Sequence, residues 1–238
     1  MPDRPVDDER FHGRRKGKPL RAGRQRLMET LLPRLAIPLP EGTPAPMIDP
    51  FTLFGRPVKA VWLEIGFGGG EHLCAQAAAH PDIGFIGAEV FEYGVGKALS
   101  QIDDRGLDNV RLCPDDVRPL LARLPEACLE RLFVLFPDPW PKTRHAKRRM
   151  IQPARLDLFG HLLVDGGELR VASDDMGYVR WTLRHATDHR LFRWTATGPG
   201  DWREPPADWV QTRYEAKALA VGRKPAYMVF RRLPRVTV

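Results

Sequence analysis

The sequence has 238 residues, of which 43% are hydrophobic, and a formal net charge of +7. This length and apolar content allow one sizeable hydrophobic core, so we expect one domain with an appendage rather than two full domains. The sequence contains no secretory signal pattern and no apolar run of transmembrane length, and its three cysteines are too few for a disulfide framework or a zinc pattern. We therefore expect a reduced, cytoplasmic protein with a polyanionic partner, no membrane contact and no metal.

The first 26 residues carry most of the excess positive charge. They hold nine Lys and Arg against four Asp and Glu, with few aliphatic side chains. Such a segment cannot bury enough apolar surface to become ordered by itself. Residues 24–35 then place leucines on one helical face ahead of a proline-rich stretch. We therefore predict a flexible, basic RNA-binding arm over residues 1–26, a short helix and linker over residues 27–50, and a folded domain over residues 51–238.

From about residue 58 onward, short apolar runs alternate with helical stretches, which is typical of a parallel sheet with crossover helices. The predicted strands cover residues 58–64, 83–89, 110–113, 131–136 and 168–172, and the predicted helices cover residues 71–79, 94–103, 117–123 and 153–164. Two later apolar runs, 192–197 and 226–232, flank a loop-rich stretch and are expected to pair antiparallel. The predicted fold class is α/β, with a mostly parallel sheet, an antiparallel edge hairpin and helices on both faces.

A glycine-rich loop follows the first predicted strand. Gly66 and Gly68 lie in the run Gly66-Phe67-Gly68-Gly69-Gly70, where glycines permit a tight turn and a close approach of a ligand. A dinucleotide fingerprint starting at Gly66 would need its third glycine at position 71, which is Glu71. Glu64, directly before the loop, would repel phosphates but attract a cationic amino-acid group. The loop therefore predicts a cofactor without phosphates.

Carboxylates also follow the second and third predicted strands. Ligands of open α/β sheets bind at the carboxyl ends of the strands, where Glu89 is placed to accept hydrogen bonds from ribose hydroxyls. Asp116, after the third strand, is placed to accept a hydrogen bond from an adenine amino group. Together with Glu64 they fit a cationic, phosphate-free nucleoside and do not fit NAD or ATP. We therefore predict S-adenosylmethionine as the cofactor.

The fourth predicted strand leads into an unusual segment, Pro137-Asp138-Pro139-Trp140-Pro141-Lys142, followed by a basic run to Arg149. Three prolines restrict the backbone and present one carboxylate and one large aromatic side chain at the expected reaction centre. A stiff turn would explain the prolines but not Asp138 or Trp140. Because the basic run lies directly beside this loop, we expect it to contact phosphates.

These residues resemble the bacterial tRNA (guanine-N7)-methyltransferase family, from the arm around Gly13 to the C-terminus, and most specifically over residues 136–149. The resemblance implies a Rossmann-like class I methyltransferase with a seven-stranded sheet, acting on a guanine in the variable loop of tRNA. It implies that the cofactor is bound by Glu64, Gly66, Gly68, Glu89, Asp116 and Asp138. It implies that Asp138 is catalytic and that substrate is bound by Lys142, Asp174, Thr212, Arg213, Tyr214 and Glu215.

The predicted RNA contacts come from the basic loop and the arm. They are Arg144, His145, Lys147, Arg148, Arg149, Arg14, Arg15 and Lys16. Thr143 departs from the family, which has a basic residue at that position. The predicted partner is tRNA, with no DNA and no obligatory protein partner.

The chemistry of guanine N7 agrees with this site. N7 carries an in-plane lone pair and no proton, so its attack on a sulfonium methyl group needs no general base. The protein has to align the reacting atoms and stabilise the developing positive charge, which suits Asp138. Trp140 is suited to stacking on an extruded base.

Two other functions are compatible with parts of the sequence. Methyltransferases for exocyclic amino groups of DNA use Asp/Asn-Pro-Pro-aromatic after the fourth strand, whereas Asp138-Pro139-Trp140 has one proline fewer. An RNA-binding protein with the same fold but no catalysis is the second alternative, against which the intact carboxylates argue. Nucleoside analysis of treated RNA distinguishes all three.

Overall fold

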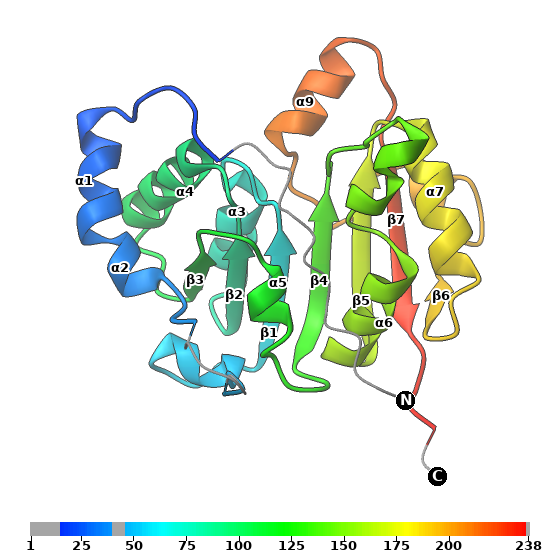
Figure 1. Ribbon diagram of the computed structural model, residues 1–238, viewed down its shortest axis with the longest axis horizontal. Helices are drawn as coiled ribbons and strands as arrows, with labels where there is room; N and C mark the ends of the chain where they lie inside the picture. Colours follow the sequence, from blue (N-terminus) through cyan, green and yellow to red (C-terminus); the bar gives the residue numbers. More distant parts are fainter. Residues whose placement is uncertain (1–14, 40–45, 237–238) are drawn as a thin grey trace.

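The computed structural model describes residues 15–39 and 46–236. Within these ranges the strands are β1 (Ala60–Ile65), β2 (Ile83–Ala88), β3 (Val110–Cys113), β4 (Leu129–Leu135), β5 (Leu163–Ser173), β6 (Phe192–Trp194) and β7 (Ala226–Arg232). They form one seven-stranded sheet in the order β3-β2-β1-β4-β5-β7-β6 (Figure 1). β1 pairs in parallel with β2 and β4, and β7 is antiparallel to both β5 and β6. The predicted fold class is confirmed, including the antiparallel edge.

Helices cover both faces of the sheet. The α-helices are α1 (Ala22–Thr30), α2 (Leu32–Leu35), α3 (Glu71–Ala79), α4 (Glu92–Arg105), α5 (Arg118–Leu121), α6 (Pro153–Leu162), α7 (Met176–Thr187), α8 (Gly200–Arg203) and α9 (Arg213–Ala220), and the 3₁₀ helices are η1 (Pro50–Phe54) and η2 (Thr143–Arg148). No helix in the described part of the chain is both long and apolar enough to cross a membrane.

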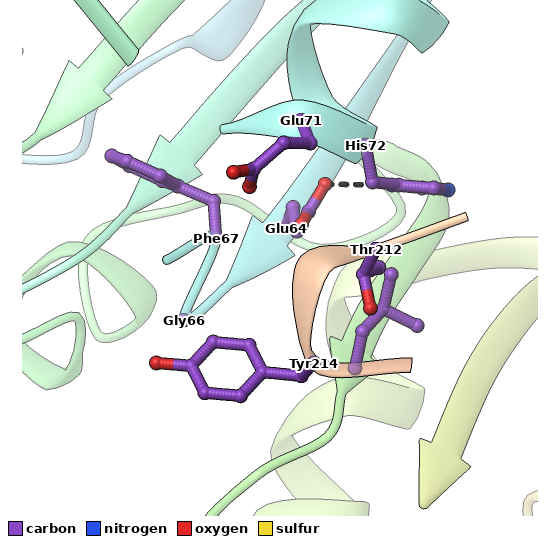
Figure 2. A pocket seen from close by; sticks show the side chains of 8 residues that line it. Glu64, Gly66, Phe67, Glu71, His72, Thr212 and Tyr214 are labelled. Carbon is purple, nitrogen blue, oxygen red and sulfur yellow. Dashed lines mark hydrogen bonds and ion pairs between the residues drawn. The ribbon is translucent and has the colours of Figure 1, made fainter. Parts of the chain in front are cut away.

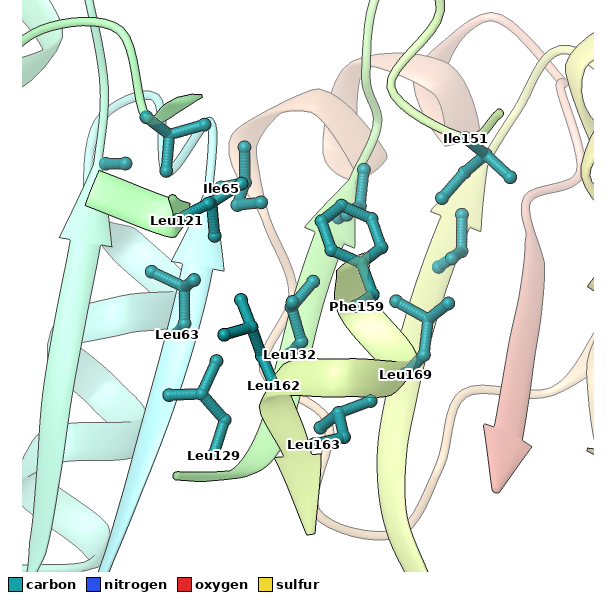
Figure 3. Packing of buried hydrophobic residues seen from close by; sticks show 14 of the residues in the cluster. Leu63, Ile65, Leu121, Leu129, Leu132, Ile151, Phe159, Leu162, Leu163 and Leu169 are labelled. Carbon is teal, nitrogen blue, oxygen red and sulfur yellow. The ribbon is translucent and has the colours of Figure 1, made fainter. Parts of the chain in front are cut away.

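Two apolar clusters hold the helices on the sheet. On one face, Phe159 of α6 and Leu121 of α5 pack with Leu63, Leu132 and Leu169 of the strands (Figure 3). On the other face, α3 and α4 contribute a second buried cluster, against which α1 and α2 pack. Because both faces are covered, the central strands are almost continuously buried, as expected for parallel sheets.

The long connection between β6 and β7 contains secondary structure that the sequence did not suggest. We predicted a loop-rich stretch there, and the structure contains the short helices α8 and α9. α9 starts with a capping box in which the Thr212 side chain accepts a hydrogen bond from the Glu215 backbone N–H and the Glu215 side chain accepts one from that of Thr212. In Figure 1 α9 lies above the carboxyl ends of the strands.

The N-terminal segment packs along α4. Leu20 lies against Gly96, and the Arg24 guanidinium lies 5.3 Å from the centre of the Tyr93 ring. The predicted boundary at residue 26 therefore falls inside α1. Arg14, one of the predicted RNA contacts, lies outside the described residues.

The glycine-rich loop packs closely on α4. Gly66, Gly68 and Gly70 have φ values of +76°, +58° and +79°, which L side chains rarely adopt. A Cβ atom on Gly94, in the first turn of α4, would lie 2.2 Å from the Gly68 carbonyl oxygen. The absence of a side chain at Gly94 therefore sets the distance between the loop and the helix.

We predict that Gly94→Ala lowers the free energy of unfolding by about 1–3 kcal/mol, because the new methyl group forces the loop and the helix apart. The matched control is Gly23→Ala, where a Cβ atom meets nothing within 4 Å. That change is expected to be neutral or to stabilise α1 by up to about 1 kcal/mol. Urea unfolding of the two variants measures both values, and equal stabilities would contradict the close packing described for Gly94.

Candidate active site

A cleft of about 700 Å³ opens at the carboxyl ends of β1, β2, β3 and β4. The glycine-rich loop, the turn before α4 and the segment before α5 line one part of it. The loop after β4 and the start of α9 line the other part. This volume is in the usual range for sites that enclose a small molecule. The cleft lies where ligands of open α/β sheets bind.

Glu89 joins the glycine-rich loop to the start of α4. One of its carboxylate oxygens accepts a hydrogen bond from the Gly68 backbone N–H (2.8 Å), and the other accepts hydrogen bonds from those of Val90 (2.8 Å) and Phe91 (2.9 Å). Burial raises the pKa of Glu89 above its ordinary value, although these three hydrogen bonds oppose the shift. A carboxylate has about four acceptor positions, so it retains capacity for a ligand hydroxyl.

Asp116 lines the same cleft beside the next strand. Its carboxylate accepts hydrogen bonds from the Arg118 backbone N–H (3.0 Å) and from Nε of the Arg118 side chain (2.7 Å). Burial by itself would raise the pKa of Asp116, but the hydrogen bonds and charge of Arg118 outweigh it and lower that pKa. Arg118 also lines the cleft. The sequence analysis did not single it out, because a lone arginine after a strand carries no distinctive pattern.

Glu64 lies in a small recess of about 10 Å³ (Figure 2). Its carboxylate is buried and lies 2.8 Å from Nδ1 of the equally buried His72. Gly66 and Tyr214 line both this recess and the larger cleft. The recess is therefore a side branch of the cleft, with room for about one water molecule.

The capping box of α9 fixes the side chains that cover the cleft. The buried Glu215 carboxylate accepts hydrogen bonds from Trp209 Nε1 (2.7 Å) and from the Tyr227 hydroxyl (2.5 Å). Glu215 therefore ties α9 to β7. Tyr214 lies over the glycine-rich loop, since a Cβ atom on Gly68 would be 3.2 Å from the Tyr214 ring.

The loop after β4 has strained backbone at both ends. Phe136 and Trp140 have φ values of +50° and +42°, which are uncommon for residues other than glycine. The Phe136 N–H donates to the Ala172 carbonyl (2.8 Å), which anchors the loop on β5. Asp138, between the two strained residues, is exposed and lines the cleft. Such strain is concentrated at functional sites.

The basic run after this loop forms η2, and its side chains differ in position. Lys142, Arg144 and Lys147 are exposed, and His145 packs edge-on against the Trp140 ring, with centroids 5.7 Å apart. The Arg148 guanidinium lies 5.0 Å from the centre of the same ring. Arg149 is the exception, because its side chain is buried.

Comparison with known proteins identifies the family. The family described as "Putative methyltransferase" matches residues 58–228. A tRNA (guanine-N(7)-)-methyltransferase of Rhodospirillum rubrum is 72% identical over 235 residues, covering 99% of this chain and 92% of that protein. One of Paramagnetospirillum magneticum is 51% identical, covering 95% and 94%. The chain belongs to the tRNA (guanine-N(7)-)-methyltransferase family.

Solved structures agree on the fold. An rRNA methylase from Streptococcus thermophilus aligns with a TM-score of 0.50 at 16% identity, covering 73% of this chain and 87% of that protein. A putative methyltransferase from Streptococcus mutans in complex with SAH aligns with a TM-score of 0.50 at 13% identity, covering 74% and 90%. Both similarities support the methyltransferase fold, and the family assignment predicted from the sequence is confirmed.

The cleft of this family member brings together most of the residues predicted for the cofactor. Gly66, Gly68, Glu89, Asp116 and Asp138 all line it, and Glu64 lines its side branch. Of the predicted substrate residues, Arg213 and Tyr214 line the cleft. Three others have partners inside the protein: Thr212 and Glu215 in the capping box, and Asp174 in an ion pair with Arg223 (2.8 Å).

Two predicted RNA residues of the arm are described by the structure. Arg15 and Lys16 precede α1, and the Arg15 guanidinium forms an ion pair with Asp115 at the edge of the cleft (2.7 Å). The Arg15 carbonyl also accepts a hydrogen bond from the Glu92 N–H (3.0 Å). This end of the arm therefore adjoins the cofactor side of the cleft.

We predict that Glu89→Gln weakens S-adenosylmethionine binding by about 2–3 kcal/mol, the range for losing hydrogen bonds to a charged acceptor. The amide also places an N–H₂ group against backbone N–H donors. The control is Glu92→Gln. Glu92 lies three residues further along the chain and does not line the cleft, so this change removes the same charge away from the site. Titration calorimetry measures both affinities. Unchanged binding by the Glu89 variant would remove Glu89 from the cofactor site.

The raised pKa of Glu89 predicts a pH dependence. Its stability contribution is present at low pH and is lost as the pH rises through the raised pKa, because the folded protein favours the protonated form. A hydrogen bond from a ribose hydroxyl is stronger to the ionised carboxylate than to the protonated group, so cofactor affinity should fall as Glu89 becomes protonated. We expect the ratio of wild-type affinity to Glu89→Gln affinity to fall on acidification. Because the pKa of Glu89 is raised, this fall should begin at a higher pH than it would for a glutamate with the ordinary pKa. Parallel pH profiles for the two proteins would refute this assignment.

Proposed function

We propose that this protein transfers the methyl group of S-adenosylmethionine to N7 of a guanine in tRNA, giving N7-methylguanosine. The observation that carries the proposal is that one cleft joins Glu89, Asp138 and Lys147. The same cavity thus combines a carboxylate suited to ribose, a carboxylate suited to the reacting base and a cation suited to the RNA backbone. The reaction named for the related proteins and the lining of this cleft both support the proposal.

The cofactor side of the cleft fits S-adenosylmethionine. Gly66 and Gly68 leave the backbone accessible, and the strand ends supply the carboxylate acceptors Glu89 and Asp116. Glu89 and Asp116 would hold the ribose and the adenine directly, and Glu64 would act on the amino-acid group through a water molecule in the side branch. When bound, the cofactor supplies an electrophilic methyl group on a sulfonium centre.

The substrate side of the cleft fits a guanine base. Asp138 would accept hydrogen bonds from the Watson–Crick edge of guanine and stabilise the positive charge that develops on the methylated ring. Trp140 lines the cleft beside it and presents an aromatic surface flanked by the Arg148 guanidinium. No side chain has to remove a proton, because N7 carries none, so catalysis depends on alignment and electrostatics.

The proposed tRNA surface runs from the cleft over η2. Exposed Lys142, Arg144 and Lys147, together with His145 and Arg148, would contact phosphates near the reacting base. Arg14, Arg15 and Lys16 of the arm would extend this surface. Asp174, Thr212, Arg213, Tyr214 and Glu215 would shape the substrate side. We further propose that the target is the variable-loop guanine, and that the enzyme is cytoplasmic and acts on tRNA rather than DNA without an obligatory protein partner.

We predict that the purified full-length protein forms N7-methylguanosine in tRNA, and that Asp138→Asn lowers the single-turnover rate by roughly 100-fold. The control is Asp104→Asn, an exposed position on the last turn of α4. Nucleoside analysis by mass spectrometry identifies the product. N6-methyladenosine would instead support a methyltransferase for amino groups, absence of any product would support a binding protein, and full activity of the Asp138 variant would refute its catalytic role.

A further inference from the structure

Arg149 differs from every other cation of the basic run in where it lies. Its side chain is 9% exposed, whereas Lys142, Arg144 and Lys147 are exposed to solvent. A buried guanidinium requires hydrogen-bond acceptors inside the protein. A phosphate contact, by contrast, requires the group to reach the surface.

The acceptors of Arg149 belong to the loop that carries Asp138. Nε donates to the Pro139 carbonyl (2.9 Å), and a terminal guanidinium nitrogen donates to the Trp140 carbonyl (3.0 Å). These carbonyls belong to the two residues that directly follow Asp138. The planar guanidinium is suited to such a two-point contact, because its N–H groups form a rigid fork.

Arg149 is in turn held by α7. Its guanidinium lies 4.5 Å from the centre of the Trp181 ring, and Trp181 Nε1 donates to the Ile151 carbonyl (2.6 Å). The backbone carbonyl of Arg149 accepts hydrogen bonds from Gln152 (2.6 Å) and Arg155 (3.0 Å). The side chain therefore connects α7 to the loop that carries Asp138.

The loop needs such support because its backbone is strained. Trp140 adopts a left-handed conformation with φ of +42°, and the surrounding structure has to compensate for the cost of that conformation. Arg149 bonds the carbonyl of this same residue. Without it, the segment between the strained residues Phe136 and Trp140 would lose two hydrogen bonds on its C-terminal side.

We infer that Arg149 is a positioning residue that fixes the Asp138 loop, rather than a contact to RNA phosphates. This inference rests on the proposed role of Asp138 in methyl transfer. It gives Arg149 a different function from the one expected when the basic run is taken as a single RNA-binding cluster. The remaining cations of η2 keep their proposed contacts with RNA.

The test compares Arg149→Gln and Arg149→Lys with Lys147→Gln in the full-length protein, using S-adenosylmethionine and transcribed tRNA. Filter binding over a salt series gives the tRNA Kd and its salt dependence, and single-turnover kinetics at saturating tRNA gives the transfer rate. Calorimetric titration with S-adenosylmethionine counts the folded molecules, so rates refer to folded protein.

For Arg149→Gln we expect a tRNA Kd within about twofold of wild type and an unchanged salt slope, but a transfer rate that is lower by about tenfold to 100-fold, because small misplacement of a catalytic group is costly. Arg149→Lys should restore part of the rate, since its ammonium can donate to one of the two carbonyls. Lys147→Gln should instead raise the tRNA Kd and make the salt slope smaller by about 0.7–0.9, because its exposed ammonium group is a proposed phosphate contact.

Two outcomes would overturn the inference. A higher Kd and smaller slope for Arg149→Gln, with the saturating rate retained, would make Arg149 a phosphate contact. Wild-type rate and affinity would show that the loop does not need it. If the Gln variant does not fold, the same criteria apply to Arg149→Lys. Failure of the proposed function would give a different result, because the wild-type protein itself would then form no N7-methylguanosine.

Discussion

The three hydrogen bonds that Glu89 accepts from Gly68, Val90 and Phe91 hold the cofactor side of the cleft together. A glycine-rich loop exposes backbone N–H groups that need acceptors, and a helix start exposes several more. One partly buried carboxylate accepts hydrogen bonds from both and thereby brings the loop against α4. The close approach of Gly94 to the Gly68 carbonyl depends on the same arrangement. The energetic cost of burying Glu89 is visible in its raised pKa.

The opposite wall of the cleft is built from segments that are distant in sequence. Asp208 accepts hydrogen bonds from Arg170 of β5 and Arg131 of β4, which fastens the connection ahead of α9 onto the sheet. Glu215 then links α9 to β7 through the Tyr227 hydroxyl. Neither acidic side chain lines the cleft. They hold in place the helix that carries Tyr214 and Arg213, and an error in their packing would displace both.

The sequence predicted the fold, the family and the bounds of regular elements such as α3 and β3, because strong alternation of apolar runs leaves little ambiguity. It did not predict α9, whose Thr212-x-x-Glu215 start matches a capping box but was interpreted only as a substrate motif. It also treated the basic run as uniform. The charge pattern alone cannot predict that Arg149 turns inward. That orientation depends on the Pro139 and Trp140 carbonyls, which belong to a loop with positive φ values that the sequence does not reveal. The sequence also did not predict the contact between the Glu64 carboxylate and His72 Nδ1, because it forms only when α3 packs beside the end of β1.

The two walls of the cleft meet at one point. Tyr214, on the α9 wall, lies so close to Gly68 that even a methyl group there would press on its ring at 3.2 Å. The Gly68 N–H also donates to Glu89, so a single residue contacts both Tyr214 and the carboxylate proposed to bind ribose. Asp138, in the loop after β4, lines the same cleft; burial is the main cause of the raised pKa values of Glu89 and Tyr214, and the charge of Asp138 adds to both. Three groups from three separate elements thus share one electrostatic environment, and the charge of Asp138 acts on groups from both walls of the cleft.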